Sequence, residues 1–177
     1  MFMSVTTRTA GFNTIDLSNL SDSGTLLSLI LMLIGGSPGS TAGGLKTTTI
    51  AVVVIAVFSM AKGGDDINTF KRRIVSDVVK QSAVIILIYL FAVMLSSMII
   101  CSVEGLGMSQ VLFETASAAG TVGVSKGITN QISVISKIIL MIMMYGGRIG
   151  GLSLVLVFGQ RKPEAPVKRP TEQILIG

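Results

Sequence analysis

The sequence contains no histidine, and Cys101 is its only cysteine. These absences exclude a disulfide framework and a zinc site built from cysteine and histidine, since each needs several such side chains. They also remove the side chain that enzymes most often use as a general acid or base. No other polar cluster with catalytic spacing is visible, so we expect that the chain is not an enzyme.

Charged residues are also scarce. They make up 13% of the sequence, about half the usual quarter, whereas 50% of the residues are apolar. So few charges cannot cover a hydrophobic core with a water-facing surface, and lipid is therefore the expected solvent. The formal net charge of +5 does not favour a nucleic-acid partner, because the cations lie beside long hydrophobic stretches. We predict an all-α membrane protein.

Three long hydrophobic stretches set the expected helices. Residues 82–101 are twenty residues without a charge, the length of a membrane-spanning helix. Residues 132–158 are long enough to span with tilt, although they include two cations. Residues 25–60 would reach about 54 Å as one helix, against a hydrocarbon core of about 30 Å. Five glycines and a proline at 35–44 predict that this stretch is a helix, a loop and a second helix.

The positions of the cations predict the orientation. Lysine and arginine gather in residues 62–81 and after residue 160, whereas residues 13–24 and 102–107 hold neither. By the positive-inside rule, the first two segments are expected in the cytoplasm and the other two outside. Residues 70–80 place apolar side chains at helical spacing beside cations, which predicts a short amphipathic helix on the membrane surface. We therefore expect a multi-pass protein of the plasma membrane with a cytoplasmic linker and C-terminus.

The sequence contains an internal repeat. Residues 9–13 (TAGFN) and 121–125 (TVGVS) share one pattern at a separation of 112, and the Gly-Gly pairs at 35–36 and 146–147 lie 111 apart. Two separate signals thus indicate the same period. The second copy comprises a spanning helix, a short segment at 109–118, a glycine-containing loop and another spanning helix. The first copy begins only at its loop.

The short segment predicts a re-entrant helix. Ten residues reach about 15 Å, half of the bilayer. The loop that follows would offer a row of carbonyl oxygens, and its glycine lets successive carbonyls point the same way. Such rows, behind short helices with negative C-terminal ends, replace the hydration shell of potassium. Tight-turn glycines are the alternative interpretation. The predicted filter, and the only expected metal site, is a potassium site at Thr9, Ala10, Gly11, Thr121, Val122 and Gly123.

Several segments together resemble one known family. They are residues 7–13 (TRTAGFN), 35–46, 120–123 (GTVG), 146–148 (GGR) and 172–177. They resemble the Trk/Ktr/HKT superfamily of potassium transporters, and most closely the Ktr-type membrane subunit, over nearly the whole chain. The resemblance implies four units of helix, pore loop and helix around a single pore, each giving one filter glycine. This chain would hold the fourth unit and the filter and second helix of the third, as a C-terminal fragment.

The resemblance also implies partners and domain limits. The full-length subunit is expected to form a homodimer in membrane lipid, on a cytosolic nucleotide-binding gating ring. No nucleic acid and no covalent cofactor are expected; K+ is the transported ion, and Na+ as a coupling ion stays open. The expected domains are residues 1–61 (filter loop and broken second helix of the third pore unit), 62–81 (cytoplasmic amphipathic linker), 82–159 (fourth pore unit) and 160–177 (cytoplasmic tail).

The glycine-rich loop is a candidate gate. From its Gly-Gly pair to the next Gly-Gly-Leu the first copy takes eight steps and the second copy takes four, so the extra residues are not needed to cross the membrane. A loop of small residues below the filter could occlude the pore and move aside. A snorkelling side chain is the alternative interpretation of Lys46. The candidate gate consists of Gly35, Gly36, Ser37, Pro38, Gly39, Ser40, Thr41, Ala42, Gly43, Gly44 and Lys46.

Three charged residues complete the expected site. Arg148 lies deep in the last hydrophobic stretch, where a cation is costly unless it faces water or a partner. The resemblance implies that it faces the pore as an electrostatic barrier; the alternative is a structural arginine bonded to carbonyls of a broken helix. Arg8 and Glu114 are expected to support the filter, either as an ion pair or through separate contacts with backbone or water.

These observations predict potassium uptake across the plasma membrane by a pore-forming subunit, with selection by loop carbonyls and gating by the glycine-rich loop. A nonconducting fragment is one alternative. A secondary transporter of another fold with broken helices is a second, although such folds favour inverted repeats and these two copies run in parallel.

The orientation is testable by cysteine labelling. In a Cys101→Ser background, Asp16→Cys should react with a membrane-impermeant thiol reagent added outside, and Lys71→Cys should not, because only the segment without lysine or arginine is expected outside. The opposite pattern would contradict both the orientation and the predicted filter.

Overall fold

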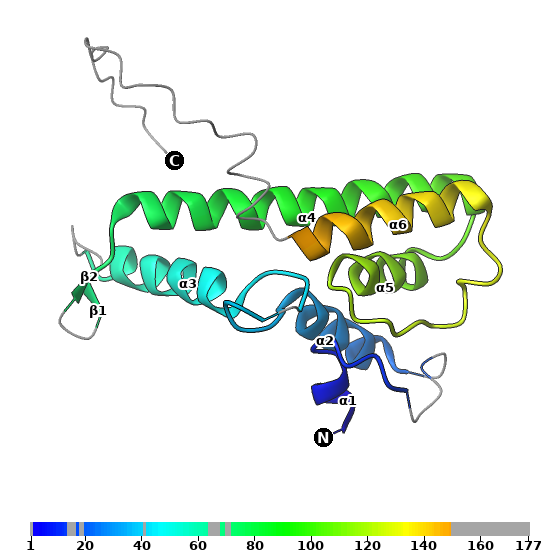
Figure 1. Ribbon diagram of the computed structural model, residues 1–177, viewed down its shortest axis with the longest axis horizontal. Coiled ribbons are helices and arrows are strands. Elements are labelled where there is room, and N and C mark those ends of the chain that lie inside the picture. The colour runs from blue at the N-terminus through cyan, green and yellow to red at the C-terminus, as the bar shows by residue number, and fades with distance from the viewer. Residues whose placement is uncertain are drawn as a thin grey trace, which may run out of the picture.

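A computed structural model of the protein describes residues 2–13, 17, 20–40, 42–63, 68, 69 and 72–149. Within these residues the structure is helical apart from one small hairpin, which agrees with the predicted all-α class (Figure 1). The elements are α1 (Phe2–Thr6), α2 (Asp22–Leu33), α3 (Thr47–Ala61), β1 (Asn68–Thr69), β2 (Arg72–Arg73), α4 (Ser76–Glu104), α5 (Met108–Ala119) and α6 (Val134–Ile149).

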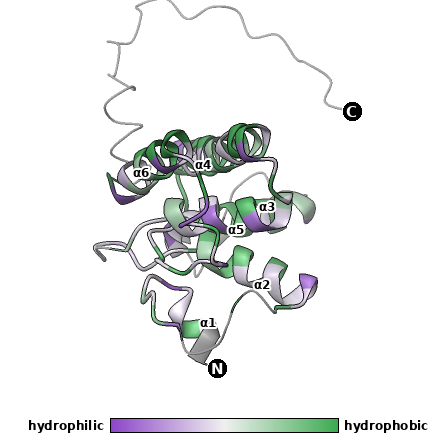
Figure 2. Ribbon diagram, turned by 90° about the vertical axis from the view of Figure 1, so that its right-hand side faces the viewer, coloured by the Kyte–Doolittle hydropathy of each residue, from purple (hydrophilic) through white to green (hydrophobic). Residues whose placement is uncertain are grey.

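Helix α4 is the longest element and carries the expected span at 82–101. Its 29 residues make it the one helix of the described chain that is long and apolar enough to cross a membrane. Large apolar side chains on it are exposed, including Leu87 at 66% and Phe91 at 68%. An outer surface of this kind is suited to lipid. Helices α4 and α6 form one layer, above α3 and α5, with α2 and α1 beneath (Figure 2).

The predicted break in the first hydrophobic stretch is confirmed. Helix α2 begins after Ser21, whose hydroxyl accepts the Gly24 N–H, and it ends at Leu33. Helix α3 begins at Thr47. Helix α2 packs on α5 and α3 packs on α4, with the glycine-rich loop between them (Figure 1).

Helix α5 extends the predicted short helix by one residue at each end and lies at the centre of the structure. It packs on α2, α4 and α6, and residues 113–119 are all buried. The Thr115 and Ser97 hydroxyls lie 2.7 Å apart and join α5 to α4 by a buried hydrogen bond. A helix of twelve residues, about 18 Å long, is too short to cross the bilayer, so its C-terminal end lies within the protein.

Helix α6 begins beside the C-terminal end of α4. The Glu104 carboxylate accepts the Ser133 N–H at 2.8 Å and the hydroxyls of Ser133 and Ser136. A carboxylate at this place satisfies a free N–H group and complements the positive end of the helix. The expected span at 132–158 is described as a helix up to Ile149, and its remaining residues lie outside the described ones, as does the expected tail at 160–177.

The predicted amphipathic helix at 70–80 is wrong. Strands β1 and β2 pair antiparallel, with Asn68 opposite Arg73, and α4 begins at Ser76. The helical spacing that suggested a separate helix continues into α4 through Val78. Asp77 lies in the first turn of α4, where an acidic side chain stabilises the positive helix end, so the helix boundary falls before it.

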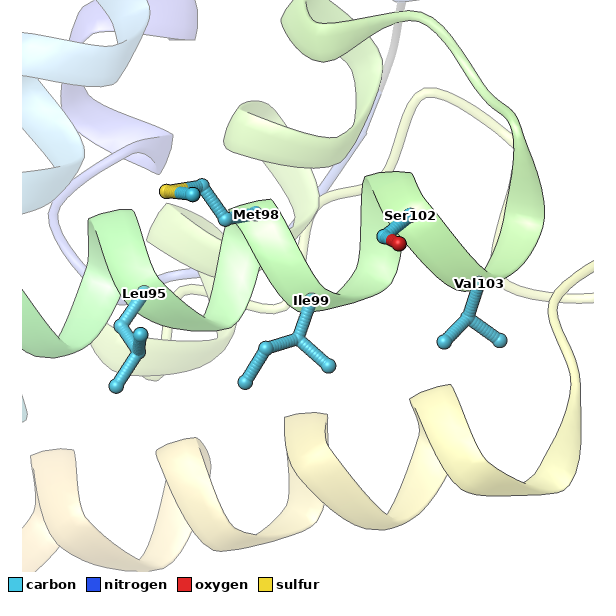
Figure 3. A pocket seen from close by; sticks show the side chains of 5 residues that line it. All are labelled: Leu95, Met98, Ile99, Ser102 and Val103. Atoms are coloured by element: carbon cyan, nitrogen blue, oxygen red, sulfur yellow. The ribbon is translucent and has the colours of Figure 1, made fainter.

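A shallow hollow lies on the C-terminal half of α4, where Leu95, Ile99 and Val103 point toward α6 (Figure 3). Its lining comes from one helix and is apolar apart from Ser102. Ligand sites combine an apolar wall with several converging polar groups. The polar groups of this protein converge elsewhere, in the loops beside α5.

Helices α5 and α6 meet at a glycine. A Cβ atom at Gly147 would overlap the Ala119 carbonyl at the end of α5, whereas a Cβ atom at Gly146 would meet open space. The absence of a side chain at Gly147 therefore allows the two helices to approach backbone to backbone.

This contact gives a stability prediction with a matched control. Gly147→Ala should lower the free energy of unfolding by about 1–3 kcal/mol, because the added methyl group forces α5 and α6 apart. Gly146→Ala should leave it unchanged or raise it by about 0.5–1 kcal/mol through helix propensity. Thermal unfolding in detergent measures both; equal effects at the two positions would contradict the close packing.

Candidate functional site

The two predicted filter loops have positive φ values at the same two positions. Thr9 and Thr121 have φ values of +66° and +53°, and they are the only residues other than glycine with positive φ in the described part of the chain. Gly11 and Gly123 have φ values of +73° and +88°. A positive φ is costly for threonine, and such strain gathers at functional sites. Each loop thus follows one unusual path, 112 residues apart.

The structure brings these two loops together. A Cβ atom on Gly11 would lie 2.6 Å from the Val122 carbonyl oxygen and 3.7 Å from the Gly123 Cα atom. A Cβ atom on Gly123 would lie 3.7 Å from the Gly11 Cα atom. The predicted filter residues therefore meet backbone against backbone, with no side chain between the two glycines.

The N–H groups of both loops turn back to the preceding helix. Ala10 and Gly11 donate to the Thr6 carbonyl at 3.2 and 3.3 Å. Thr121 and Val122 donate to carbonyls in the last turn of α5 at 3.0 and 2.9 Å. Among the hydrogen bonds of the described residues, none has a carbonyl of residues 9–11 or 121–123 as its acceptor.

Apolar side chains hold the second loop in place. Val122 and Val124 are each 3% exposed and pack with Met32 and Phe113 in one core cluster, whereas Gly123 between them is exposed. The alternation fixes which side of the loop faces the core. Only the side without a side chain remains open.

The glycine-rich loop is closed at its base by backbone hydrogen bonds. Gly35 donates to the Leu45 carbonyl at 2.7 Å, and Leu45 donates to the Leu33 carbonyl at 3.1 Å. Thr47 adds a bond to the Gly36 carbonyl at 3.3 Å. These bonds replace those that the helix break removes, as backbone surrounded by apolar groups requires.

Lys46 binds two carbonyl groups near the tip of this loop. Its ammonium group donates to the Ala42 carbonyl at 2.6 Å and to the Ser40 carbonyl at 3.0 Å. Residues 37–40 form an exposed turn above it, in which Ser40 donates to the Ser37 carbonyl. These contacts support a role of Lys46 in the loop over a snorkelling side chain. Thr41, also in the candidate gate, lies outside the described residues.

The glycine-rich loop touches the second filter loop directly. The Gly43 N–H donates to the Thr121 hydroxyl oxygen at 3.1 Å. A Cβ atom on Gly44 would lie 3.5 Å from the Gly120 Cα atom. The candidate gate and the candidate filter are therefore in contact, although 78 residues separate the two hydrogen-bonded groups.

The three charged residues of the predicted site, Arg8, Glu114 and Arg148, lie in separate surroundings. Arg8 and Arg148 are both exposed, Arg148 in the last turn of α6. Glu114 is buried; one carboxylate oxygen accepts the Thr129 hydroxyl, and the other has no hydrogen-bond partner in the described structure. Arg8 and Glu114 thus form no ion pair among the described residues.

One charged contact was not expected from the sequence. The Lys126 ammonium group donates to the Thr25 hydroxyl at 2.7 Å and lies 5.4 Å from the centre of the Phe113 ring. It therefore joins the end of the second filter loop to α2 and places a cation over an aromatic face. Its position between the buried residues Val124 and Ile128 is the only signal that could have indicated it.

Comparison with known proteins identifies the family. The TrkH family model, described as a cation transport protein, matches residues 1–168. The chain belongs to the TrkH family. This confirms the resemblance to potassium transporters, and it confirms that the chain belongs to a family of cation transporters and not to an enzyme family. Because the family consists of transporters and α4 is a candidate span, this TrkH chain is an all-α membrane protein.

Curated relatives extend beyond the TrkH segment described here. The chain is 38% identical over 177 residues to Ktr system potassium uptake protein D of Bacillus subtilis, covering 100% of this chain and 39% of that protein. It is 37% identical over 187 residues to potassium/sodium uptake protein NtpJ of Enterococcus hirae, covering 99% and 40%. It is 34% identical over 176 residues to Ktr system potassium uptake protein B of Vibrio alginolyticus, covering 99% and 38%. The chain thus spans about two fifths of these relatives.

Proposed function

We propose that this TrkH segment forms part of a potassium-uptake pore in the plasma membrane, in which carbonyl oxygens of residues 9–11 and 121–123 select the ion. The observation that carries the proposal is the pair of touching loops, which share positive φ values at corresponding residues and whose carbonyl oxygens accept no hydrogen bond from the other described residues. A potassium ion loses its water shell only where such oxygens replace it. The names of the relatives, which refer to potassium or to potassium and sodium, support the choice of ion.

The electrostatics of α5 support cation binding at the second loop. The loop follows directly on the C-terminal end of α5, which carries partial negative charge from the helix dipole. Glu114 lies buried in the same helix and contacts Thr129, beyond the loop. Both features lower the electrostatic energy of a cation at the loop, and Arg148 on α6 would oppose cation entry from the other side.

The glycine-rich loop serves as the gate in this proposal. Its closed base keeps it attached to α2 and α3, Lys46 holds its tip, and Gly43 contacts the filter. A cytosolic nucleotide-binding ring acting on a homodimer would move it aside, with the linker and the C-terminus in the cytoplasm. A coupling role of Na+ fits the potassium/sodium relative. A nonconducting fragment is the second candidate, favoured by the coverage of about two fifths of the relatives.

The filter is tested by a pair of glycines with equal backbone strain. Gly123 and Gly127 both have φ +88°, but only Gly123 lies against the other filter loop. In the intact transporter, Gly123→Ser should lower the preference for potassium over sodium about tenfold, a loss of about 1.4 kcal/mol in ion discrimination. Gly127→Ser should carry the same folding cost and leave the preference unchanged.

Growth of a potassium-uptake-deficient strain at low potassium, with and without sodium, measures this preference. An unchanged preference in the Gly123→Ser variant, or an equal loss in the Gly127→Ser variant, would remove Gly123 from the filter.

The gate is tested by shortening the exposed turn. Deletion of residues 37–40 should raise potassium flux and make it less dependent on the cytosolic partner, because the turn held by Lys46 would no longer occlude the pore. Replacement of the same four residues by glycine and serine keeps the length and serves as the control. Uptake into reconstituted vesicles decides the question once insertion and assembly are shown; normal or reduced flux that still needs the partner would make the loop structural.

A further inference from the structure

Gly43 fits against Thr121 without room for a side chain. Its N–H donates to the Thr121 hydroxyl oxygen at 3.1 Å. A Cβ atom on Gly43 would overlap that oxygen, and would lie 2.8 Å from the Thr121 methyl carbon and 3.1 Å from the Gly120 carbonyl oxygen. The contact therefore depends on the glycine on one side and on the hydroxyl on the other.

The hydroxyl satisfies a buried donor. Gly43 is buried, and an N–H group without a partner in such a place is costly. The base of the glycine-rich loop is held by its own bonds at Gly35 and Leu45, which do not involve Thr121. The bond between Gly43 and Thr121 is thus an additional attachment, placed between the loop and the filter.

The corresponding threonine of the first filter loop lacks this attachment. Thr9 has a similar φ, but it is exposed at its hydroxyl contact and donates to the carbonyl of its own neighbour, Arg8, at 2.6 Å. The two threonines thus have similar φ values and different side-chain partners. Among the described residues, only the second predicted filter loop is connected to the glycine-rich loop through its threonine side chain.

We propose that Thr121 is a positioning residue that latches the glycine-rich loop to the second filter loop. While the latch is closed, the loop and the filter hold each other in place. When the loop moves, the Gly43 N–H leaves the hydroxyl and the strained backbone at Thr121 loses one restraint. The inference rests on the proposed gate. It goes beyond that proposal by naming the contact through which movement of the glycine-rich loop and the conformation of the filter loop affect each other.

The latch predicts how readily the loop opens. In the intact transporter with Cys101→Ser, the thiol of Ala42→Cys, half-buried beside Gly43, reports on movement of the glycine-rich loop. Thr121→Val removes the acceptor at nearly constant volume and should raise the labelling rate about fivefold, the size expected for one net hydrogen bond. Thr121→Ser keeps the hydroxyl, and Thr9→Val makes the same change in the other loop. Both should leave the rate within about twofold.

A second pair of variants tests the same contact from the side of the glycine-rich loop. Gly43→Ala should also raise the labelling rate, because the methyl group would overlap Thr121, whereas Gly107→Ala, where a Cβ atom meets open space and φ is −62°, should not. Equal rates in the Thr121→Val and Thr121→Ser variants, or equal acceleration by Thr9→Val, would overturn the latch. If Thr121→Val does not assemble, Gly43→Ala decides alone, and an unchanged rate overturns the proposal.

The labelling rate does not depend on ion flux, so the two proposals can fail separately. Absence of potassium uptake by the unaltered transporter would refute the proposed function while the labelling series still tests the latch. Uptake with no difference in labelling among the variants would refute the latch alone.

Discussion

Backbone polar groups in an apolar environment must find partners, and this constraint governs the helix breaks in the described part of the chain. In the glycine-rich loop, a backbone hydrogen bond joins Gly35 to Leu45 at the base, and the Lys46 ammonium group binds carbonyls near the tip. In the two loops at Gly11 and Gly123, the N–H groups of Ala10, Gly11, Thr121 and Val122 bond to carbonyls of the preceding helices. These loops thus turn back onto the ends of the helices that they follow.

Elements that depend on length and glycine content could be predicted from the sequence. The span at 82–101, the break at 35–44 and the short helix at 109–118 all follow from local composition, and the structure contains each of them. The N-terminal boundary of α4 could not be predicted, because the apolar spacing before Ser76 continues without change into the helix. The result was a predicted amphipathic helix where the structure has a hairpin.

The contacts within the candidate site could be predicted less well from the sequence. The bond from Lys126 to Thr25 joins residues 101 positions apart, and nothing local in either segment indicates the other. The positive φ of Thr121 is likewise unexpected, because threonine usually avoids that region. The repeat predicted that two loops correspond, whereas the packing of Val122 and Val124 decides which side of the second loop stays open.

The contact at Gly147 has a mechanical consequence. Because α6 rests there on the carbonyl of Ala119 without an intervening side chain, no flexible group can absorb a small displacement between them. A tilt of the C-terminal end of α6 would therefore act on the last residue of α5, which directly precedes Gly120 and the filter loop. The contact at Ala119 therefore constrains the start of the predicted filter loop at Thr121, two residues further along the chain.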